Sequence, residues 1–92
     1  MEEQRFTFKD LKHILVDRVG IPEAQVSDDL NKTFEDMGLD SLAIVDMQLA
    51  IQQKYGIQIG DGEAVHIKTA GAAIEFTNRR INEKEAADAG PH

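Results

Sequence analysis

The stretch of sequence that decides the fold is DMGLDSL at residues 36–42, where a polar segment gives way to apolar residues at helical spacing. Asp40 stands directly before these residues, at the position where a side-chain oxygen accepts the unpaired backbone N–H groups of a helix. We therefore predict that a helix begins at Ser41. Gly56 predicts its end after Tyr55, because glycine readily adopts the left-handed conformation that closes helices. Ser41 would then lie on the first turn, beside acidic side chains and with no general base next to it.

Two apolar clusters lie on opposite sides of this predicted helix. One spans an arc of roughly 80° at about 100° per residue and should face the core. Its members are Ile44, Met47, Ile51 and Tyr55. The other covers the first two turns and consists of Leu42, Val45 and Leu49. A helix in a small bundle seldom buries two opposite faces, so we predict that the second cluster is at least partly exposed and contacts partners. The alternative is that the preceding loop covers it.

Three other helical segments are predicted, one before this helix and two after it. Thr7 and Asp10 form a capping-box pattern before a first helix that ends at Gly20. Residues 21–40 form a long polar loop, whose apolar side chains are expected to anchor it to the core. These side chains are Ile21, Val26, Leu30 and Phe34, with a short helical turn expected near Leu30.

The last third of the chain predicts a short helix and a longer one. Asp61 is expected to cap the short third helix, which would reach Val65 and Ile67, and Thr69 is expected to cap the last helix. After Asn82 the sequence turns polar, so we expect residues 83–92 to form a flexible tail. The prediction is an all-α protein: one domain over residues 1–92, with an ordered core over about 6–81. Its four helices form a small bundle, with a long loop between the first two and a short third helix.

Composition narrows the possible functions. The 92 residues allow one small domain, too small for an enzyme with an enclosed pocket, and the absence of cysteine excludes disulfides and thiolate chemistry. No apolar run is long enough to span a membrane and the N-terminus is acidic, which predicts a soluble, cytoplasmic protein. The net charge of −7 lies entirely between Glu23 and Glu63, around Ser41. Nucleic acid is therefore an unsuitable partner, whereas a docking surface for basic proteins is favoured.

Residues around Ser41 resemble the attachment motif of acyl carrier proteins. The motif has an acidic residue, a glycine, any residue and then Asp-Ser-Leu, and it is matched by Glu35 or Asp36, Gly38, Asp40, Ser41 and Leu42. The resemblance extends over about residues 6–81. It implies that a phosphopantetheinyl transferase, with magnesium, joins 4′-phosphopantetheine from coenzyme A to Ser41, with Asp40 in a supporting role. The protein would then be a non-catalytic carrier of thioesters, with no catalytic residue and no metal site of its own.

The segments 33–36, 40–43 and 74–78 look most like the discrete carriers of bacterial aromatic polyketide synthases. This similarity implies malonyl units and growing polyketide chains as cargo. The implied partners are a malonyl transferase, a ketosynthase pair, a ketoreductase and cyclases, acting on a monomer. The residues expected to recognise them are Leu42, Val45, Asp46, Leu49, Asp36, Asp61 and Glu63. Fatty acid carriers are the first alternative, and peptidyl carriers, which usually have glycine where Leu39 stands, come third.

A rival from another class is an unmodified helical interaction domain that uses the Leu42, Val45 and Leu49 cluster. A hydrolase is disfavoured, because no G-x-S-x-G elbow surrounds Ser41. The acidic residues lack calcium-loop spacing, and the three histidines lack the spacing of a zinc site.

Overall fold

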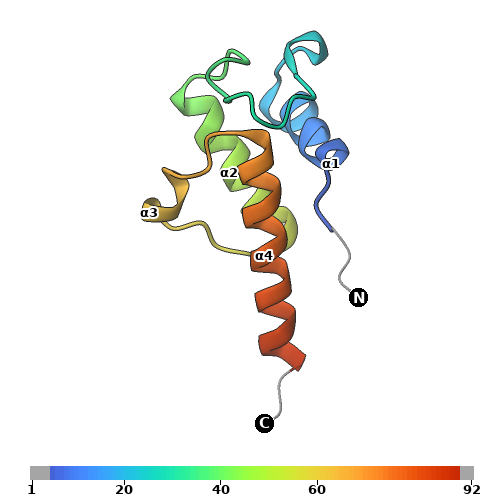
Figure 1. Ribbon diagram of the computed structural model, residues 1–92, viewed down its shortest axis with the longest axis vertical. Coiled ribbons are helices and arrows are strands. Elements are labelled where there is room, and N and C mark those ends of the chain that lie inside the picture. Colours follow the sequence, from blue (N-terminus) through green and yellow to red (C-terminus); the bar gives the residue numbers. More distant parts are fainter. Residues whose placement is uncertain (1–4, 90–92) are drawn as a thin grey trace.

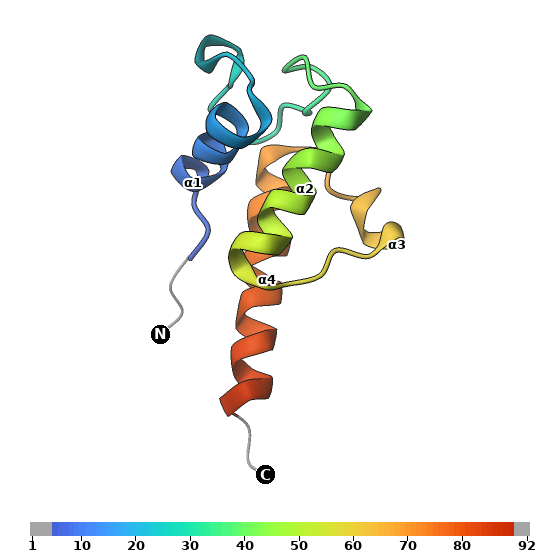
Figure 2. The ribbon, with the colours of Figure 1, turned by 180° about the vertical axis from the view of Figure 1, so that it is seen from behind.

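The computed structural model describes residues 5–89, with only the backbone described for 87–89. In chain order the elements are α1 (Phe8–His13), its π-helical continuation η1 (Ile14–Val19), the 3₁₀ turn η2 (Glu23–Gln25), α2 (Ser41–Tyr55), α3 (Asp61–Ala64) and α4 (Ala70–Ala89). α4 crosses in front of α2 in the middle of the view of Figure 1 and behind it in Figure 2, with α1 on one side of the two helices and α3 on the other. Within residues 5–89 there is no strand. The predicted all-α bundle, with a long loop before its second helix and a short third helix, is confirmed.

The first helix begins as predicted and changes type partway. Thr7 Oγ1 accepts the Asp10 N–H at 3.3 Å, and Asp10 Oδ2 accepts the Thr7 N–H at 3.0 Å, which completes the capping box. From Ile14 the helix continues in π-helical form to Val19. Gly20, at φ +89°, closes it by donating to the carbonyl of Leu15.

The core is mainly aliphatic and is built from every main helix except α3. Its large members are Phe6, Leu11, Ile14, Leu15, Phe34, Met37, Leu39, Met47, Ile51, Ile57, Ile67, Ile74 and Ile81. Of the stripe predicted on α2, Met47 and Ile51 are buried, whereas Ile44 and Tyr55 are half-buried and pack against the core. The ring of Phe6 meets Tyr55 edge-to-face, with centroids 5.2 Å apart.

Tyr55 provides a test of this packing. Partial burial, followed by the negative charge of Asp10, raises the pKa of the Tyr55 phenol above its ordinary value. We expect a spectrophotometric titration to give a midpoint above that of free tyrosine, and this signal is clean because Tyr55 is the sole tyrosine and the chain lacks tryptophan. Since the folded-state pKa is raised, this contribution to stability is complete below the ordinary pKa and is lost as the pH rises through the folded value. In denaturant the midpoint should fall to the ordinary value; an unchanged midpoint would contradict the packing.

Two backbone hydrogen bonds attach the long loop to the start of α4 and to the residues just before it. The Gly71 N–H donates to the carbonyl of Leu30 at 2.9 Å, and the Phe34 N–H donates to the carbonyl of Lys68 at 2.9 Å. A Cβ on Gly71 would lie 3.0 Å from the Leu30 oxygen, so glycine allows the close approach. The expectation that the Leu30 side chain anchors the loop is wrong, because its carbonyl makes the contact and the side chain is exposed. Leu30 lies in a hydrogen-bonded turn, in which the Lys32 N–H donates to the Asp29 carbonyl at 3.1 Å, whereas the helical turn of the loop is at Glu23–Gln25.

Two expected boundaries in the last third of the chain also need correction. The N-cap of α3 is Gly60, so Asp61 is the first helical residue, and the helix ends at Ala64 before Val65 and Ile67. α4 starts after Thr69, whose Oγ1 accepts the Ala72 N–H at 3.1 Å as predicted. It continues to Ala89, past the end expected near Asn82, because residues 83–89 are rich in Glu, Lys and Ala, which favour helices. The flexibility of 83–92 stays a prediction, and residues 90–92 lie outside the described part. None of the helices in residues 5–89 combines the length and the apolar character that crossing a bilayer requires.

Candidate functional site

Ser41 is the first residue of α2 and its side chain is exposed. The helix begins there because Asp40 has extended backbone geometry and its Oδ1 accepts the Ala43 N–H at 2.8 Å. The carbonyl of Asp40 also accepts the Ile44 N–H at 3.0 Å, which closes the first turn. The hydroxyl is thus held on a rigid element, where an enzyme can reach it from outside.

The residues just before Ser41 fold into a compact turn. The Gly38 N–H donates to the carbonyl of Glu35, and the Leu39 N–H donates to the carbonyl of Phe34, both at 3.0 Å. Gly38 has φ +95°, which favours glycine at this position. Met37 and Leu39 are buried on either side of it. These two buried side chains fix the position of the loop and therefore of the serine that follows it.

The second apolar cluster of α2 is on the surface, as predicted. Leu42 is 70% exposed, Val45 52% and Leu49 47%. Val65, which was expected within the third helix but follows α3 in the structure, is 58% exposed. The start of α2 and α3 lie on the same side of the molecule, as both views show (Figure 2). An exposed apolar surface of this kind is typical of an interaction site.

The acidic residues predicted to recognise partners fall into two groups. Asp36, Asp46 and Asp61 are exposed and free to meet a basic surface. Glu63 is half-buried, and its carboxylate bonds to the Gly60 N–H and to Arg80 of the same chain. The Gly60 N–H, and after it Arg80, hold the pKa of Glu63 below its usual range. Glu63 is therefore engaged within the chain, and recognition of partners by the other residues stays a prediction.

A small apolar groove opens between α2 and α3. Its volume is about 280 Å³, and its lining consists of Glu35, Ile44, Ala64, Val65, Ile67 and Lys68. Ile44 lies three residues after Ser41, so the two side chains project from the same face of α2. The groove, hereafter the α2–α3 groove, was not predicted from the sequence, because the position of α3 could not be derived.

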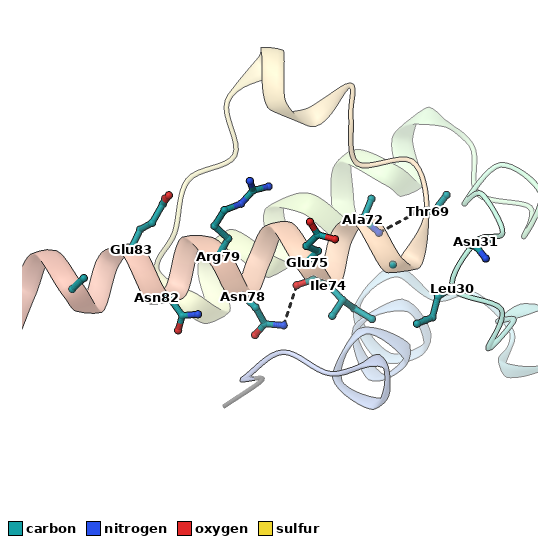
Figure 3. Close-up of a pocket in the computed structure, with 12 residues that line it drawn as sticks. Leu30, Asn31, Thr69, Ala72, Ile74, Glu75, Asn78, Arg79, Asn82 and Glu83 are labelled. Atoms are coloured by element: carbon teal, nitrogen blue, oxygen red, sulfur yellow. Dashed lines mark hydrogen bonds between the residues drawn. The ribbon is translucent and has the colours of Figure 1, made fainter. Parts of the chain in front are cut away.

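A larger hollow lies elsewhere on the molecule. It has a volume of about 970 Å³ and is lined by Leu30, Asn31 and residues of α4 and its cap, with no residue from α2 or α3 (Figure 3). One of its lining residues, Asn78, donates to the carbonyl of Ile74 at 3.0 Å and pairs twice with the backbone of Phe6, at 2.8 Å each. The Asn78 amide is thus engaged in holding the fold together. Because the hollow also has no lining residue from α2 or α3, it is not part of the serine site.

A small helical bundle that presents an exposed serine at the head of its second helix has the form of a carrier domain. Such a domain receives its chemistry as an attached group and needs no catalytic constellation of its own. A family model described as the phosphopantetheine attachment site matches residues 9–77, and the chain belongs to this family. The cofactor of the chain is accordingly covalently attached 4′-phosphopantetheine, as the motif predicted.

Two known proteins make the similarity more specific. An acyl carrier protein of Sulfurovum sp. (strain NBC37-1) is 38% identical over 69 residues, which cover 75% of this chain and 91% of the relative. The solution structures of a 3,5-dioxohexyl carrier protein, a triketide mimic from the actinorhodin polyketide synthase of Streptomyces coelicolor, match with a TM-score of 0.71 at 29% identity. That match covers 90% of this chain and 98% of the other. The predictions of an acyl carrier protein and of its fold are confirmed.

Proposed function

We propose that Ser41 is the attachment residue and that the chain presents acyl groups as thioesters at the end of the attached arm. The observation that carries this proposal is the exposure of Ser41 at the first turn of α2. The chain has one other serine, Ser27, which is half-buried and accepts the Asp29 N–H at 3.1 Å. Of the two hydroxyls, Ser41 is therefore the accessible one.

The local field supports attachment of a phosphate at this position. The first turn of a helix presents unpaired N–H groups and a partial positive potential, which stabilise a phosphodiester. The exposed carboxylates of Asp36 and Asp40 repel the same group and keep it from lying against the surface. The attaching step is a phosphoryl transfer: the Ser41 oxygen replaces the nucleotide on the pantetheine-bearing phosphorus of coenzyme A, and the hydroxyl proton leaves to a base of the transferase. Once attached, the group supplies the thiol that a chain without cysteine lacks.

The α2–α3 groove is the place we assign to a carried acyl chain. Because Ser41 and Ile44 share a face of α2, an arm that turns back from the serine reaches the groove without crossing the helix. The walls are apolar at Ile44, Val65 and Ile67, which suits a short hydrocarbon or ketide chain. Polar groups occur in its lining at Glu35 and Lys68.

We further propose that the cargo is malonyl units and growing polyketide chains. The similarity to the actinorhodin carrier supports this pathway, whereas the 38% identical relative supports carriers of acyl groups more widely and keeps fatty acid synthesis as the alternative. The partners would be a phosphopantetheinyl transferase, a malonyl transferase, a ketosynthase pair, a ketoreductase and cyclases, meeting a cytoplasmic monomer. Malonyl transfer assayed with an aromatic ketosynthase pair and with a fatty acid ketosynthase should be faster with the former. Equal or reversed rates would remove the polyketide assignment.

The attachment itself is tested by incubating the protein with coenzyme A and a promiscuous phosphopantetheinyl transferase. Intact mass should show the gain of one phosphopantetheine, and peptide fragmentation should place it on Ser41. A chain that stays unmodified while a control carrier is loaded would support the unmodified interaction domain, with the exposed Leu42, Val45 and Leu49 as its binding surface.

Asp40 has a capping role in the structure and a predicted supporting role in loading, and two substitutions separate them. Asp40→Ala removes the oxygen that accepts the Ala43 N–H, so we expect a loss of about 1 kcal/mol in the free energy of unfolding. Asp40→Asn keeps that oxygen and should retain the stability, but it should slow loading because the carboxylate charge next to the transferase's magnesium is gone. Thermal unfolding and the initial rate of mass gain measure the two effects. Wild-type loading by Asp40→Asn would leave Asp40 with the capping role alone.

A further inference from the structure

α3 has few contacts that could hold it in place. It has four residues and no buried side chain, and a helix of this length is not stable by itself in water. Ile57 before it and Ile67 after it are buried, so the ends of this segment are fixed in the core. Between them, α3 lies apart from α2 and α4 in both views (Figures 1 and 2). Whatever fixes the middle of the segment therefore decides where α3 lies.

One ion pair links α3 to α4. Arg80 donates from Nη2 to Glu63 Oε2, while its Nη1 lies 3.6 Å from Glu83 Oε1. The guanidinium is also placed over the ring of Phe76, with Cζ 5.3 Å from the centroid. Two residues of α4 thus hold Arg80 in position, and the bond to Glu63 crosses to α3. Planar guanidinium groups held in this way form well-oriented pairs with carboxylates.

The carboxylate of Glu63, on the α3 side of this ion pair, is held by two contacts. Its Oε1 accepts the Gly60 N–H at 3.0 Å, which stabilises the first turn of α3, and its Oε2 meets Arg80. One carboxylate therefore both shapes α3 and attaches it to α4. Ala64, the next residue, and Val65 belong to the lining of the α2–α3 groove. A change in the position of Glu63 must move this wall of the groove.

We propose that the Glu63–Arg80 ion pair is a positioning device that fixes α3 and thereby sets the width of the α2–α3 groove for the attached chain. The part of this inference that concerns the groove's occupant depends on the function proposed above. The part that concerns α3 does not, and it is measurable on the unmodified protein. Because exposed and half-exposed ion pairs add little to global stability, the effect of breaking this one should be local.

The first measurement is amide hydrogen exchange by NMR on the unmodified protein. We expect Arg80→Gln and Glu63→Gln to speed exchange of the Ala64 and His66 amides by about two- to fivefold, while the core amides of α2 and α4 keep their rates. Arg80→Lys, which retains the charge, should recover part of the protection. Arg79→Gln is the matched control, because it removes the same charge from the same turn. Arg79 is exposed, makes no ion pair within residues 5–86 and acts on Glu63 through its charge alone, so this variant should change the exchange rates least. Unchanged exchange in both Glu63→Gln and Arg80→Gln would overturn the proposal.

The second measurement follows the groove after loading with butyryl- and octanoyl-phosphopantetheine. In the wild type and Arg79→Gln, the side-chain methyl resonances of Ile44 and Val65 should shift more with the longer chain. In Glu63→Gln and Arg80→Gln this difference should shrink by about half or more, since an unfixed wall populates wider arrangements.

Failure of the wild type to load would contradict attachment at Ser41 but leave the exchange result standing. If all variants load normally and show the same difference between the butyryl and octanoyl methyl shifts, the proposal that this ion pair sets the width of the groove is overturned. If Arg80→Gln does not fold, the test rests on Glu63→Gln. The amide oxygen of this variant can still accept the Gly60 N–H.

Discussion

Ser41→Ala is expected to abolish the gain of phosphopantetheine completely while leaving the fold unchanged. The substitution removes the hydroxyl oxygen that would form the phosphodiester, and the chain offers no second exposed serine. Alanine is a good helix former, and the cap from Asp40 to Ala43 does not involve the Ser41 side chain. The free energy of unfolding should therefore change by about 0.5 kcal/mol or less. Intact mass after incubation with coenzyme A and a transferase measures the first effect, and thermal unfolding measures the second.

Ser27→Ala is the matched control for this experiment. It removes a hydroxyl that is half-buried and accepts the Asp29 N–H, so the variant should load as completely as the wild type. The comparison shows whether loading depends on the position of the serine or only on the presence of a serine in the chain. A mass gain in Ser41→Ala, or its loss in Ser27→Ala, would show that the attachment residue has been misplaced.

Except at α3, where Gly60 and not Asp61 is the N-cap, the caps that were predicted depend on residues only a few positions apart, so the sequence was enough to find them. Thr7, Asp40 and Thr69 accept the N–H groups that local spacing assigns to them, and Gly20 and Gly56 have the left-handed geometry expected at helix ends. The exposed apolar cluster of α2 followed from periodicity alone, because two opposite apolar faces cannot both face the core of a small bundle.

Other features depend on contacts between distant residues, and sequence spacing carries no signal for them. The π-helical form of Ile14–Val19 is one case, since apolar residues three and four apart fit both hydrogen-bond patterns. The clamp of Asn78 on the backbone of Phe6 is another, because it joins residues 72 positions apart. Met37 and Leu39 could have been recognised as buried, since they are apolar residues on either side of a glycine in a polar loop. The role of Glu63 could not, because it depends on where α4 places Arg80.

Ile51→Ala is expected to cause a large loss of stability. Ile51 is 1% exposed and belongs to the core cluster, and truncating such a side chain removes buried apolar contacts and leaves a cavity. The cost should be about 2–5 kcal/mol. A domain of this size has a free energy of unfolding of about 5–15 kcal/mol, so the loss is a large part of the total. The melting temperature should fall by about 10 °C or more, measured by far-UV circular dichroism.

Leu49→Ala is the control, because Leu49 lies two residues earlier on the same helix and is 47% exposed. Its truncation removes little packing in the free protein, so the cost should be about 1 kcal/mol or less. The two variants thus compare opposite faces of α2 at nearly constant change in side-chain volume. Equal losses would mean that the face bearing Leu49 is packed in solution. That result would contradict the proposal that Leu42, Val45 and Leu49 contact partners, because a face already covered within the monomer cannot bind a transferase or a synthase.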